Sequence, residues 1–174
     1  MRASIRGLLA AIAALAAIVV SVPSQAETTT TKEQLAGTWQ DVSFKATSGD
    51  KVGYPLGENP GGYAAFTPVR FWLLLTNSSR KAPATAAMTD DEAVSLMKSH
   101  AAYSGKYDVD PAQTPDGIKI TVHVDAASNQ ALVGTNRVFY VRVEGDKLVL
   151  KSPAIVVPTT GLLSVVQLEF VKTD

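Results

Sequence analysis

Apolar residues recur along this chain in short stretches with the every-second-residue spacing of β-strands, and glycine, proline and polar residues separate the stretches. From residue 37 onward this pattern predicts eight strands, at about 37–46, 63–67, 70–76, 103–109, 118–125, 135–144, 147–151 and 163–171. On the first strand Val42, Phe44 and Ala46 share one face. Trp39 lies on the other face, and we expect it to close the floor of the fold. The strand at 70–76 is apolar on both sides, so we expect it to be covered on both faces.

The connections between these strands carry recognisable turn residues. Gly145-Asp146 is a two-residue hairpin signal, and Asp116-Gly117 opens another. The segment 54–62 is rich in proline and glycine, which excludes a helix or a central strand there. Eight strands in meander order favour a closed antiparallel β-barrel, with a two-sheet sandwich as the alternative. The interior of such a small barrel is either filled by side chains or holds one small ligand.

One helix interrupts the strands, at about 89–103. Thr89 and Glu92 form a capping box, and the acidic residues 90–92 suit the positive end of the helix. That position explains these acids, so we do not assign them to a metal. Helical spacing places an apolar stripe on one side, made of Ala93, Val94, Leu96, Met97, His100 and Ala101. We expect this stripe to pack against one end or the side of the barrel.

The first 26 residues have the composition of a secretory signal peptide. Arg2 and Arg6 give a positive start, 8–20 is an unbroken apolar run, and small residues lead to a cleavage site after Ala26. The apolar run is shorter than the roughly 18–20 residues that span a bilayer, so we expect cleavage. An uncleaved N-terminal anchor helix is the alternative.

After cleavage we expect a disordered spacer at 27–34 and one barrel domain at 35–174, periplasmic or secreted. The full chain has 16 basic and 16 acidic residues, and losing Arg2 and Arg6 leaves a net charge of about −2. No run of like charge stands out, so we expect no nucleic-acid partner, and no membrane span once the signal is removed. Without cysteine and with two histidines, neither disulfides nor a dedicated zinc or copper site is expected. No cofactor is expected, and the oligomeric state is not indicated.

His123 is the candidate residue with the greatest chemical range. Its strand places it with Lys119, Thr121 and Asp125, opposite an aliphatic face. If the aliphatic face is the core, His123 is an outward polar residue. If the barrel contains a polar pocket, His123 can point into it as a hydrogen-bond donor or general base.

Other residues are candidates for lining a ligand cavity. Tyr63, Trp72, Tyr103 and Tyr107 combine an apolar ring with a polar group that could orient a ligand. For each of them ordinary barrel core is the alternative. Arg80 precedes the helix and could guard a cavity mouth, or simply be a solvated loop charge.

Five motifs follow one another in a fixed order, namely Leu35-x-Gly37-Thr38-Trp39, Tyr54-Pro55-x-Gly57-x-x-Pro60-x-Gly62, Ala102-Tyr103-Ser104-Gly105-x-Tyr107, Val122-His123-Val124 and Val133-Gly134-Thr135. In this order and spacing the chain resembles the bacterial and fungal lipocalin-like domain family over most of residues 35–170. The resemblance implies a lipocalin-type barrel with a hydrophobic interior suited to a small molecule. It also favours a pocket role for His123.

The chain departs from the family pattern at three places. Leu132 stands where the family usually has tryptophan, and Phe139 and Tyr140 stand where it often carries an arginine. The segment 168–170 replaces a closing Trp-x-Arg. The loss of those arginines weakens what the resemblance implies about anion binding or arginine-assisted chemistry in the cavity, and we expect the interior to be more apolar than in typical relatives.

We therefore expect an exported lipocalin-like protein that binds or carries a small, mostly apolar ligand in the barrel interior. An envelope interaction protein with a packed barrel is one alternative. An isomerase- or cyclase-type enzyme using His123 is another. The sequence contains no catalytic motif, so no catalytic residue is assigned and we lean against an enzyme.

Overall fold

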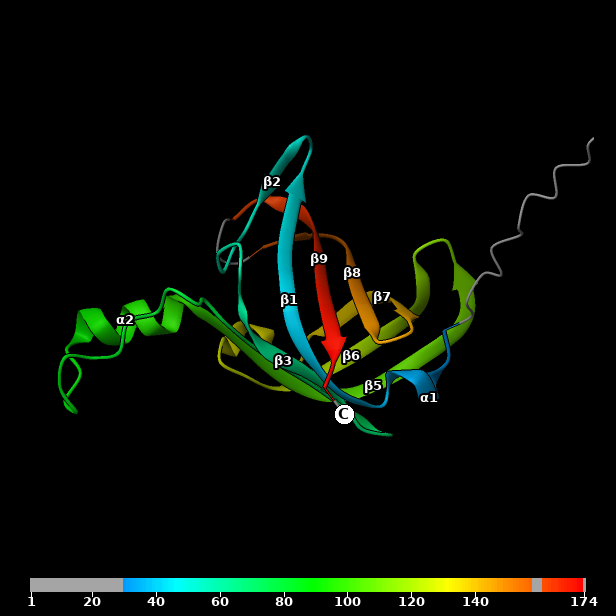
Figure 1. Cartoon of the computed structure of the whole chain (residues 1–174), viewed down its shortest axis with the longest axis horizontal. Coiled ribbons are helices and arrows are strands. Elements are labelled where there is room, and N and C mark those ends of the chain that lie inside the picture. Colours follow the sequence, from blue (N-terminus) through cyan, green and yellow to red (C-terminus); the bar gives the residue numbers. More distant parts are fainter. Residues whose placement is uncertain (1–29, 158–160, 174) are drawn as a thin grey trace, which may run out of the picture.

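A computed structural model describes residues 30–157 and 161–173, so the expected signal peptide at 1–26 lies outside the described residues. Strands make up most of the described chain (Figure 1). They are β1 (Gly37–Ser48), β2 (Lys51–Gly53), β3 (Gly61–Phe66), β4 (Arg70–Thr76), β5 (His100–Thr114), β6 (Gly117–Ala127), β7 (Asn136–Glu144), β8 (Lys147–Val156) and β9 (Leu163–Lys172). The helical elements are α1 (Lys32–Leu35), α2 (Asp90–Lys98) and the 3-10 turn η1 (Gln130–Leu132).

The strands close into a barrel through β1. Each strand from β3 to β9 pairs antiparallel with the next one along the chain, and β1 pairs with both β3 and β9. Eight strands therefore form the closed antiparallel barrel, and the short β2 only extends the far end of β1 as a hairpin. The predicted barrel is confirmed, and the sandwich alternative is wrong.

The expected hairpins connect these strands. β7 and β8 pair up to Glu144 and Lys147, which leaves Gly145-Asp146 as the two-residue turn. Gly145 has φ +62°, a left-handed conformation that costs glycine little and most other residues more. β5 and β6 are joined in the same way before Gly117.

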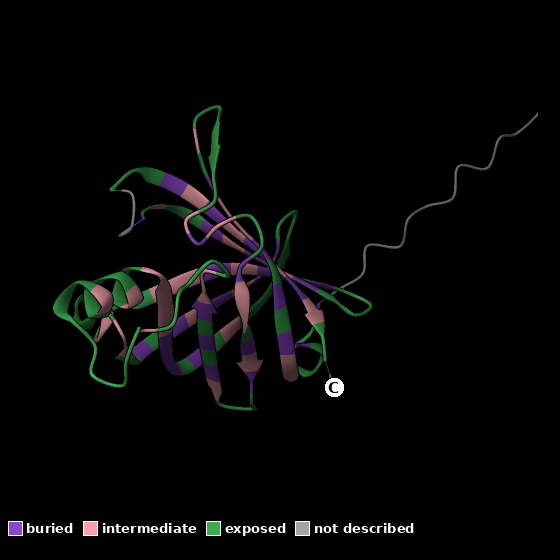
Figure 2. Ribbon diagram, turned by 60° about the vertical axis from the view of Figure 1, so that its left-hand side comes forward, coloured by how far each residue is buried: buried purple, intermediate pink, exposed green. Residues whose placement is uncertain are grey.

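Buried residues alternate with more exposed ones along most strands (Figure 2), as expected where one face of a strand meets the barrel interior. On β6 Ile118, Ile120, Val122 and Val124 are all buried, as the aliphatic face of that strand predicted. On β4 the expectation of cover on both faces is wrong. Trp72 and Leu74 point outward and are about half exposed, because no element of the described residues covers that face.

On β1 the residues that face the barrel interior are not the ones that the alternation of apolar and polar residues predicted. Asp41 pairs with Phe170 and Ser43 with Glu169, so Val42 is the extra residue of a bulge. Val42 is exposed, whereas Asp41 and Ser43 are both buried. Phe44 and Ala46 face inward only after this bulge, since one extra residue reverses the alternation. The prediction that Val42 shares their face is therefore wrong.

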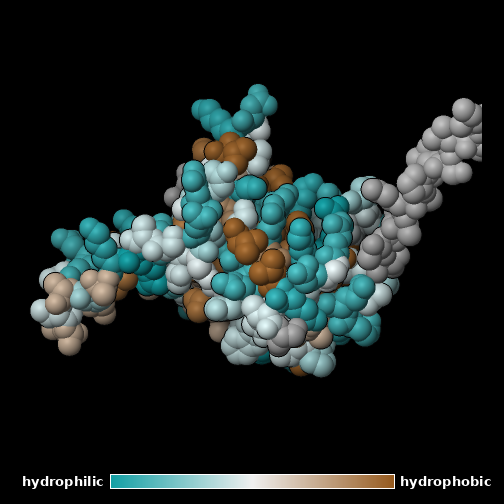
Figure 3. Space-filling model, in the orientation of Figure 1, coloured by the Kyte–Doolittle hydropathy of each residue, from teal (hydrophilic) through white to brown (hydrophobic). Residues whose placement is uncertain are grey.

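α2 begins as predicted and ends earlier. Thr89 and Glu92 form the capping box, and the helix stops at Lys98 because β5 starts at His100. None of its residues is buried, and it stands away from the barrel (Figures 1 and 3). The expectation that its apolar stripe packs against the barrel is wrong. Val94 and Met97 are each about half exposed.

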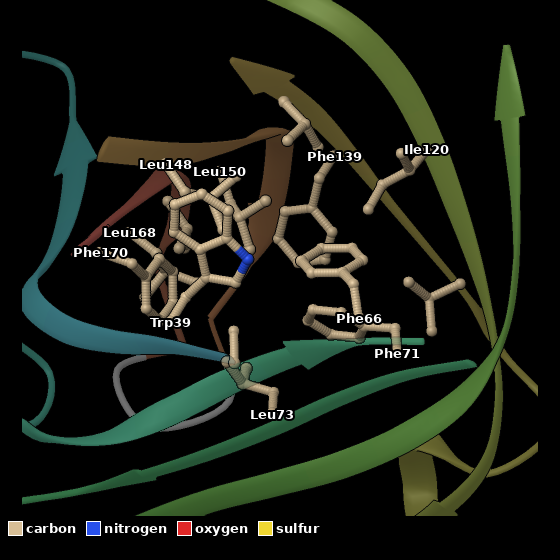
Figure 4. Packing of buried hydrophobic residues seen from close by; sticks show 14 of the residues in the cluster. Trp39, Phe66, Phe71, Leu73, Ile120, Phe139, Leu148, Leu150, Leu168 and Phe170 are labelled. Atoms are coloured by element: carbon tan, nitrogen blue, oxygen red, sulfur yellow. The ribbon is translucent and has the colours of Figure 1, made fainter. Parts of the chain in front are cut away.

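One half of the barrel interior is densely filled (Figure 4). Trp39 is fully buried there, and its Nε1 donates a hydrogen bond to the Leu35 carbonyl at 2.8 Å. The rings of Phe66 and Phe71 lie 4.8 Å apart, and Tyr107 packs edge-on against Phe66 at 5.5 Å. Trp39 thus closes the floor of the barrel, as expected.

The chain that leads into this closed end is structured from residue 30. Thr30 is buried, and its hydroxyl oxygen accepts a hydrogen bond from the Val143 backbone N–H at 3.0 Å. The Gln113 side chain donates to the Thr30 carbonyl, and α1 follows directly. The described part of the expected spacer, residues 30–34, is therefore ordered against the barrel.

Candidate functional site

The half of the barrel opposite Trp39 contains a cavity of about 630 Å³. This volume lies within the range of about 300–1,000 Å³ that small-molecule sites occupy. Most of the wall consists of apolar side chains from β1, β4, β7, β8 and β9, such as Phe44, Leu75, Phe139, Ile155 and Val166. The cavity can therefore remove a large part of an apolar ligand from water.

The cavity has a packed floor and a polar rim. Leu73 and Phe139 line the cavity and also belong to the core cluster that fills the closed half of the barrel (Figure 4). At the other end Lys98, at the end of α2, and Asn129 and Gln130, at η1, contribute to the lining. A ligand that enters past this rim meets progressively more apolar surface.

Tyr103 and Arg137 are polar side chains that the strands β5 and β7 contribute to the largely apolar wall. β5 pairs Tyr103 with Leu73, and β7 turns Arg137 to the same side as the buried Phe139. Burial raises the pKa of the Tyr103 hydroxyl, whereas the charge of Arg137 and a hydrogen bond from its side chain lower it. At neutral pH the hydroxyl is therefore neutral, next to a permanent cation.

Arg137 is the functional candidate that the sequence reasoning missed. The family arginine is replaced by Phe139 and Tyr140, and the sequence analysis did not consider Arg137. Arg137 lies two residues before Phe139, so it has the same phase on β7 and lines the cavity. The period-two pattern of 135–144 contained this information.

His123 lies on the outer face of the barrel and does not line the cavity. Its Nε2 is 2.7 Å from Oδ2 of Asp108, and its Nδ1 is 2.8 Å from Oδ1 of Asn136. The hydrogen bond to Asp108 is the main cause that raises its pKa, and Asn136 raises it further. Both ring nitrogens face acceptor oxygens, which suits the doubly protonated imidazolium. The inward alternative for His123 is therefore wrong.

The remaining candidates also lie outside the cavity. Tyr63 and Trp72 are half exposed on the outer faces of β3 and β4, and Arg80 is exposed in the loop after β4. Tyr107 is buried, but its hydroxyl donates to the Thr67 carbonyl at 3.0 Å within the filled half of the barrel. Of the six residues proposed from the sequence, Tyr103 alone lines the cavity.

A second polar group in the interior was not foreseen. Asp41 is 4% exposed, and its Oδ2 has no hydrogen-bond partner among the described residues. Its pKa is raised from 3.8 to about 7, mainly by burial and to a smaller degree by the charge of Glu169. The backbone N–H groups of Ser43 and Val42 work in the opposite direction. Asp41 does not line the cavity.

The described parts of the chain contain neither a metal-binding cluster nor a membrane-spanning helix. In residues 30–157 and 161–173 no three histidine, aspartate or glutamate side chains are grouped so that they could hold a metal ion. Over the same ranges no helix is long and apolar enough to cross a membrane.

The comparisons with known proteins bear on the barrel as a whole. Neither the curated proteins nor the solved structures gave a match. A family model described as a lipocalin-like domain matches residues 36–161, from just before β1 to the connection between β8 and β9. That match takes in most of the chain and every strand of the cavity wall except β9, so this chain belongs to the lipocalin-like domain family.

Proposed function

We propose that this protein is an exported carrier that binds one small, mostly apolar molecule inside the barrel. The observation that supports this most strongly is the cavity of about 630 Å³ with its apolar wall. Burial of an apolar ligand contributes on the order of 25 cal/mol to the free energy of binding for each Å² of apolar surface removed from water. A few hundred Å² therefore suffice for useful affinity.

The two alternatives are less well supported. An interaction protein with a packed barrel needs an interior without a void, and the cavity weighs against that. An enzyme that uses His123 needs this side chain next to a bound substrate. His123 lies on the other side of the barrel wall, where Asp108 and Asn136 occupy both ring nitrogens.

Filling the cavity tests the carrier proposal. Ala101 faces the cavity from β5, and an Ala101→Phe variant should occupy part of the ligand's space. The probe is N-phenyl-1-naphthylamine, a neutral apolar fluorophore. We expect the wild-type protein to bind it with saturable, one-to-one fluorescence enhancement, and the variant to lose affinity about tenfold or more, because overpacking and binding compete for one volume.

Ala65→Phe is the matched control. Ala65 lies on β3 opposite Trp72 in the register, on the outer face of the barrel, so the same substitution there should leave probe binding unchanged. Both variants need wild-type far-UV circular dichroism. Equal binding by wild type and Ala101→Phe, or no saturable binding at all, would contradict the proposal.

The export part of the proposal depends on residues 1–26 and has its own test. The protein is produced from its full reading frame and recovered from the periplasm or the medium, and its N-terminal sequence is then determined. We expect the mature chain to begin at Glu27. An intact N-terminus that starts at Met1 would refute cleavage.

Native mass spectrometry of the same material identifies the natural ligand. A repeatable extra mass that disappears on denaturation is the expected result. The Ala101→Phe variant, purified in parallel, should carry less of that mass.

A further inference from the structure

The charged groups of the cavity wall are all cationic. Of the residues that line it, Lys98 and Arg137 carry a permanent positive charge, and none is an aspartate or a glutamate. Lys98 lies at the rim, at the last position of α2, whereas Arg137 lies on β7 on the same face as Phe139 and interacts with Tyr103. The positive charge that a bound ligand would meet is therefore concentrated at Arg137.

Arg137 has no carboxylate partner among the described residues. The other arginines of the barrel strands are paired on the outer surface. Arg70 binds both oxygens of Asp125 at 2.8 and 2.7 Å, and Arg142 contacts Glu144 at 2.8 Å. Arg137 forms no ion pair within residues 30–157 and 161–173. A cation in an apolar cavity without a counterion is costly, and an anionic ligand group would remove that cost.

The geometry of the two polar side chains suits a carboxylate. A guanidinium presents two parallel N–H donors that match the two oxygens of a carboxylate. The Tyr103 hydroxyl lies beside Arg137 and supplies another donor. Most of the remaining wall is formed by aliphatic and aromatic side chains, which suit an extended or ring-shaped apolar body.

We propose that the natural ligand is an apolar molecule with one carboxylate, and that Arg137 binds this carboxylate with the help of Tyr103. This inference rests on the carrier function proposed above and specifies the ligand's chemical class. In this proposal Arg137 supplies the positive charge that the replacement of the family arginine by Phe139 and Tyr140 had put in doubt.

A matched pair of probes tests the proposal. Dodecanoate and dodecan-1-ol have the same twelve-carbon chain and differ in the charged end, and each is titrated below its aggregation concentration by displacement of N-phenyl-1-naphthylamine. We expect the wild-type protein to bind dodecanoate about tenfold more tightly than dodecan-1-ol or better, because a charge-assisted pair replaces a neutral contact.

Two variants assign the preference to these side chains. Arg137→Met removes the charge but keeps an apolar stem of similar length, so it should lower dodecanoate affinity about tenfold or more and leave dodecan-1-ol within about threefold. Tyr103→Phe should lower dodecanoate affinity less, by about two- to fivefold, since it removes one neutral donor. Arg142→Met on the outer face of β7 is the matched control, and it should change neither affinity.

The outcomes separate this inference from the carrier proposal. If wild type binds both probes equally, or if Arg137→Met weakens both probes to the same degree, the carboxylate inference is overturned and the carrier function is retained. If neither probe nor the fluorophore binds, both proposals fail. A loss of dodecanoate binding in Arg142→Met equal to that in Arg137→Met would also overturn the inference, because it would mark a general effect of charge.

Discussion

The buried carboxyl of Asp41 makes the stability of the barrel depend on pH. Asp41 sits at the bulge of β1 with 4% of its surface exposed, and one of its oxygens has no hydrogen-bond partner among the described residues. Its pKa is raised from 3.8 to about 7, mainly by burial. We predict that Asp41→Asn, which is neutral at every pH, removes a large part of the pH dependence of unfolding.

The size and sign follow from the two pKa values. In the unfolded chain the carboxyl ionises near 3.8, and in the barrel it stays protonated up to about 7. Its contribution to stability is therefore fully present below pH 3.8 and is lost as the pH rises through about 7. A pKa difference of about three corresponds to about 4 kcal/mol, of which about 2–3 kcal/mol is lost between pH 5 and pH 8.

The assay is urea unfolding of the mature chain at pH 5, 6, 7 and 8, followed by tryptophan fluorescence. The amide introduced by Asp41→Asn leaves an N–H unpaired at all four pH values. Its cost therefore lowers the free energy of unfolding equally at each pH and does not change how that free energy depends on pH. The informative quantity is the difference between the slopes of wild type and variant. We expect the wild type to lose about 2–3 kcal/mol more than Asp41→Asn over this range.

His123 requires a control because its titration also lowers the free energy of unfolding as the pH rises. Its pKa is raised by Asp108 and Asn136, so its contribution is present below its unfolded pKa of about 6.5 and is lost as the pH rises through the folded value. A His123→Gln variant should retain most of the wild-type pH dependence, since this side chain is exposed to solvent. If wild type and Asp41→Asn have parallel stability curves from pH 5 to 8, the account of Asp41 is refuted.

Three further substitutions test the packing, the backbone and the helix. Phe71→Ala empties the fully buried centre of the aromatic cluster and should cost about 3–5 kcal/mol in urea unfolding, and a loss below about 1 kcal/mol would contradict this packing. Gly62→Ala should destabilise the barrel by about 2 kcal/mol or more in the same assay, because φ is +140° and a Cβ would lie 2.0 Å from the Leu74 carbonyl oxygen. A wild-type midpoint would show that the strand does not have this conformation. Thr89→Ala removes a helix cap worth about 1 kcal/mol, so it should speed amide hydrogen exchange in α2 and leave the urea midpoint of the barrel unchanged. A lowered midpoint would mean that the helix packs on the barrel.

The barrel could be predicted from sequence because most of its strands have one apolar and one polar face. On β6 the aliphatic residues at 118, 120, 122 and 124 are buried without exception, and the intervening His123 is exposed. The alternation of apolar and polar residues alone thus predicted that the His123 side chain points outward. The family resemblance favoured a pocket role, and the local pattern was the better guide because it follows directly from the geometry of a strand.

The bulge on β1 could not be read from the sequence. Val42 appeared to continue the apolar face of Phe44 and Ala46, whereas Asp41 and Ser43 appeared polar and exposed. A bulge inserts one residue and reverses the alternation without any change of composition. The structure thereby buries a carboxyl that a regular strand would have placed in water.

The helix shows what an amphipathic pattern leaves open. The stripe that contains Val94 and Met97 is present, but no described element covers it. Periodicity identifies the apolar face of a helix, and only the lengths and paths of the connections decide what that face meets. For α2 the strand β5 begins so soon after Lys98 that the helix extends from the rim of the barrel (Figure 1).

The position of the cavity follows from the sizes of the side chains along each strand. At the closed end β1, β3 and β4 contribute Trp39, Phe66 and Phe71 to the interior, and these rings fill it. Toward the other end β5 contributes Ala101 to the wall. Because this side chain is small, the interior of the barrel is left partly empty there. A barrel of eight strands has room for either filling or a small ligand, and the order of large and small residues along the strands selects the end that stays open. Because Arg137 faces that open end, the only interior guanidinium in the described chain lies where a ligand can reach it.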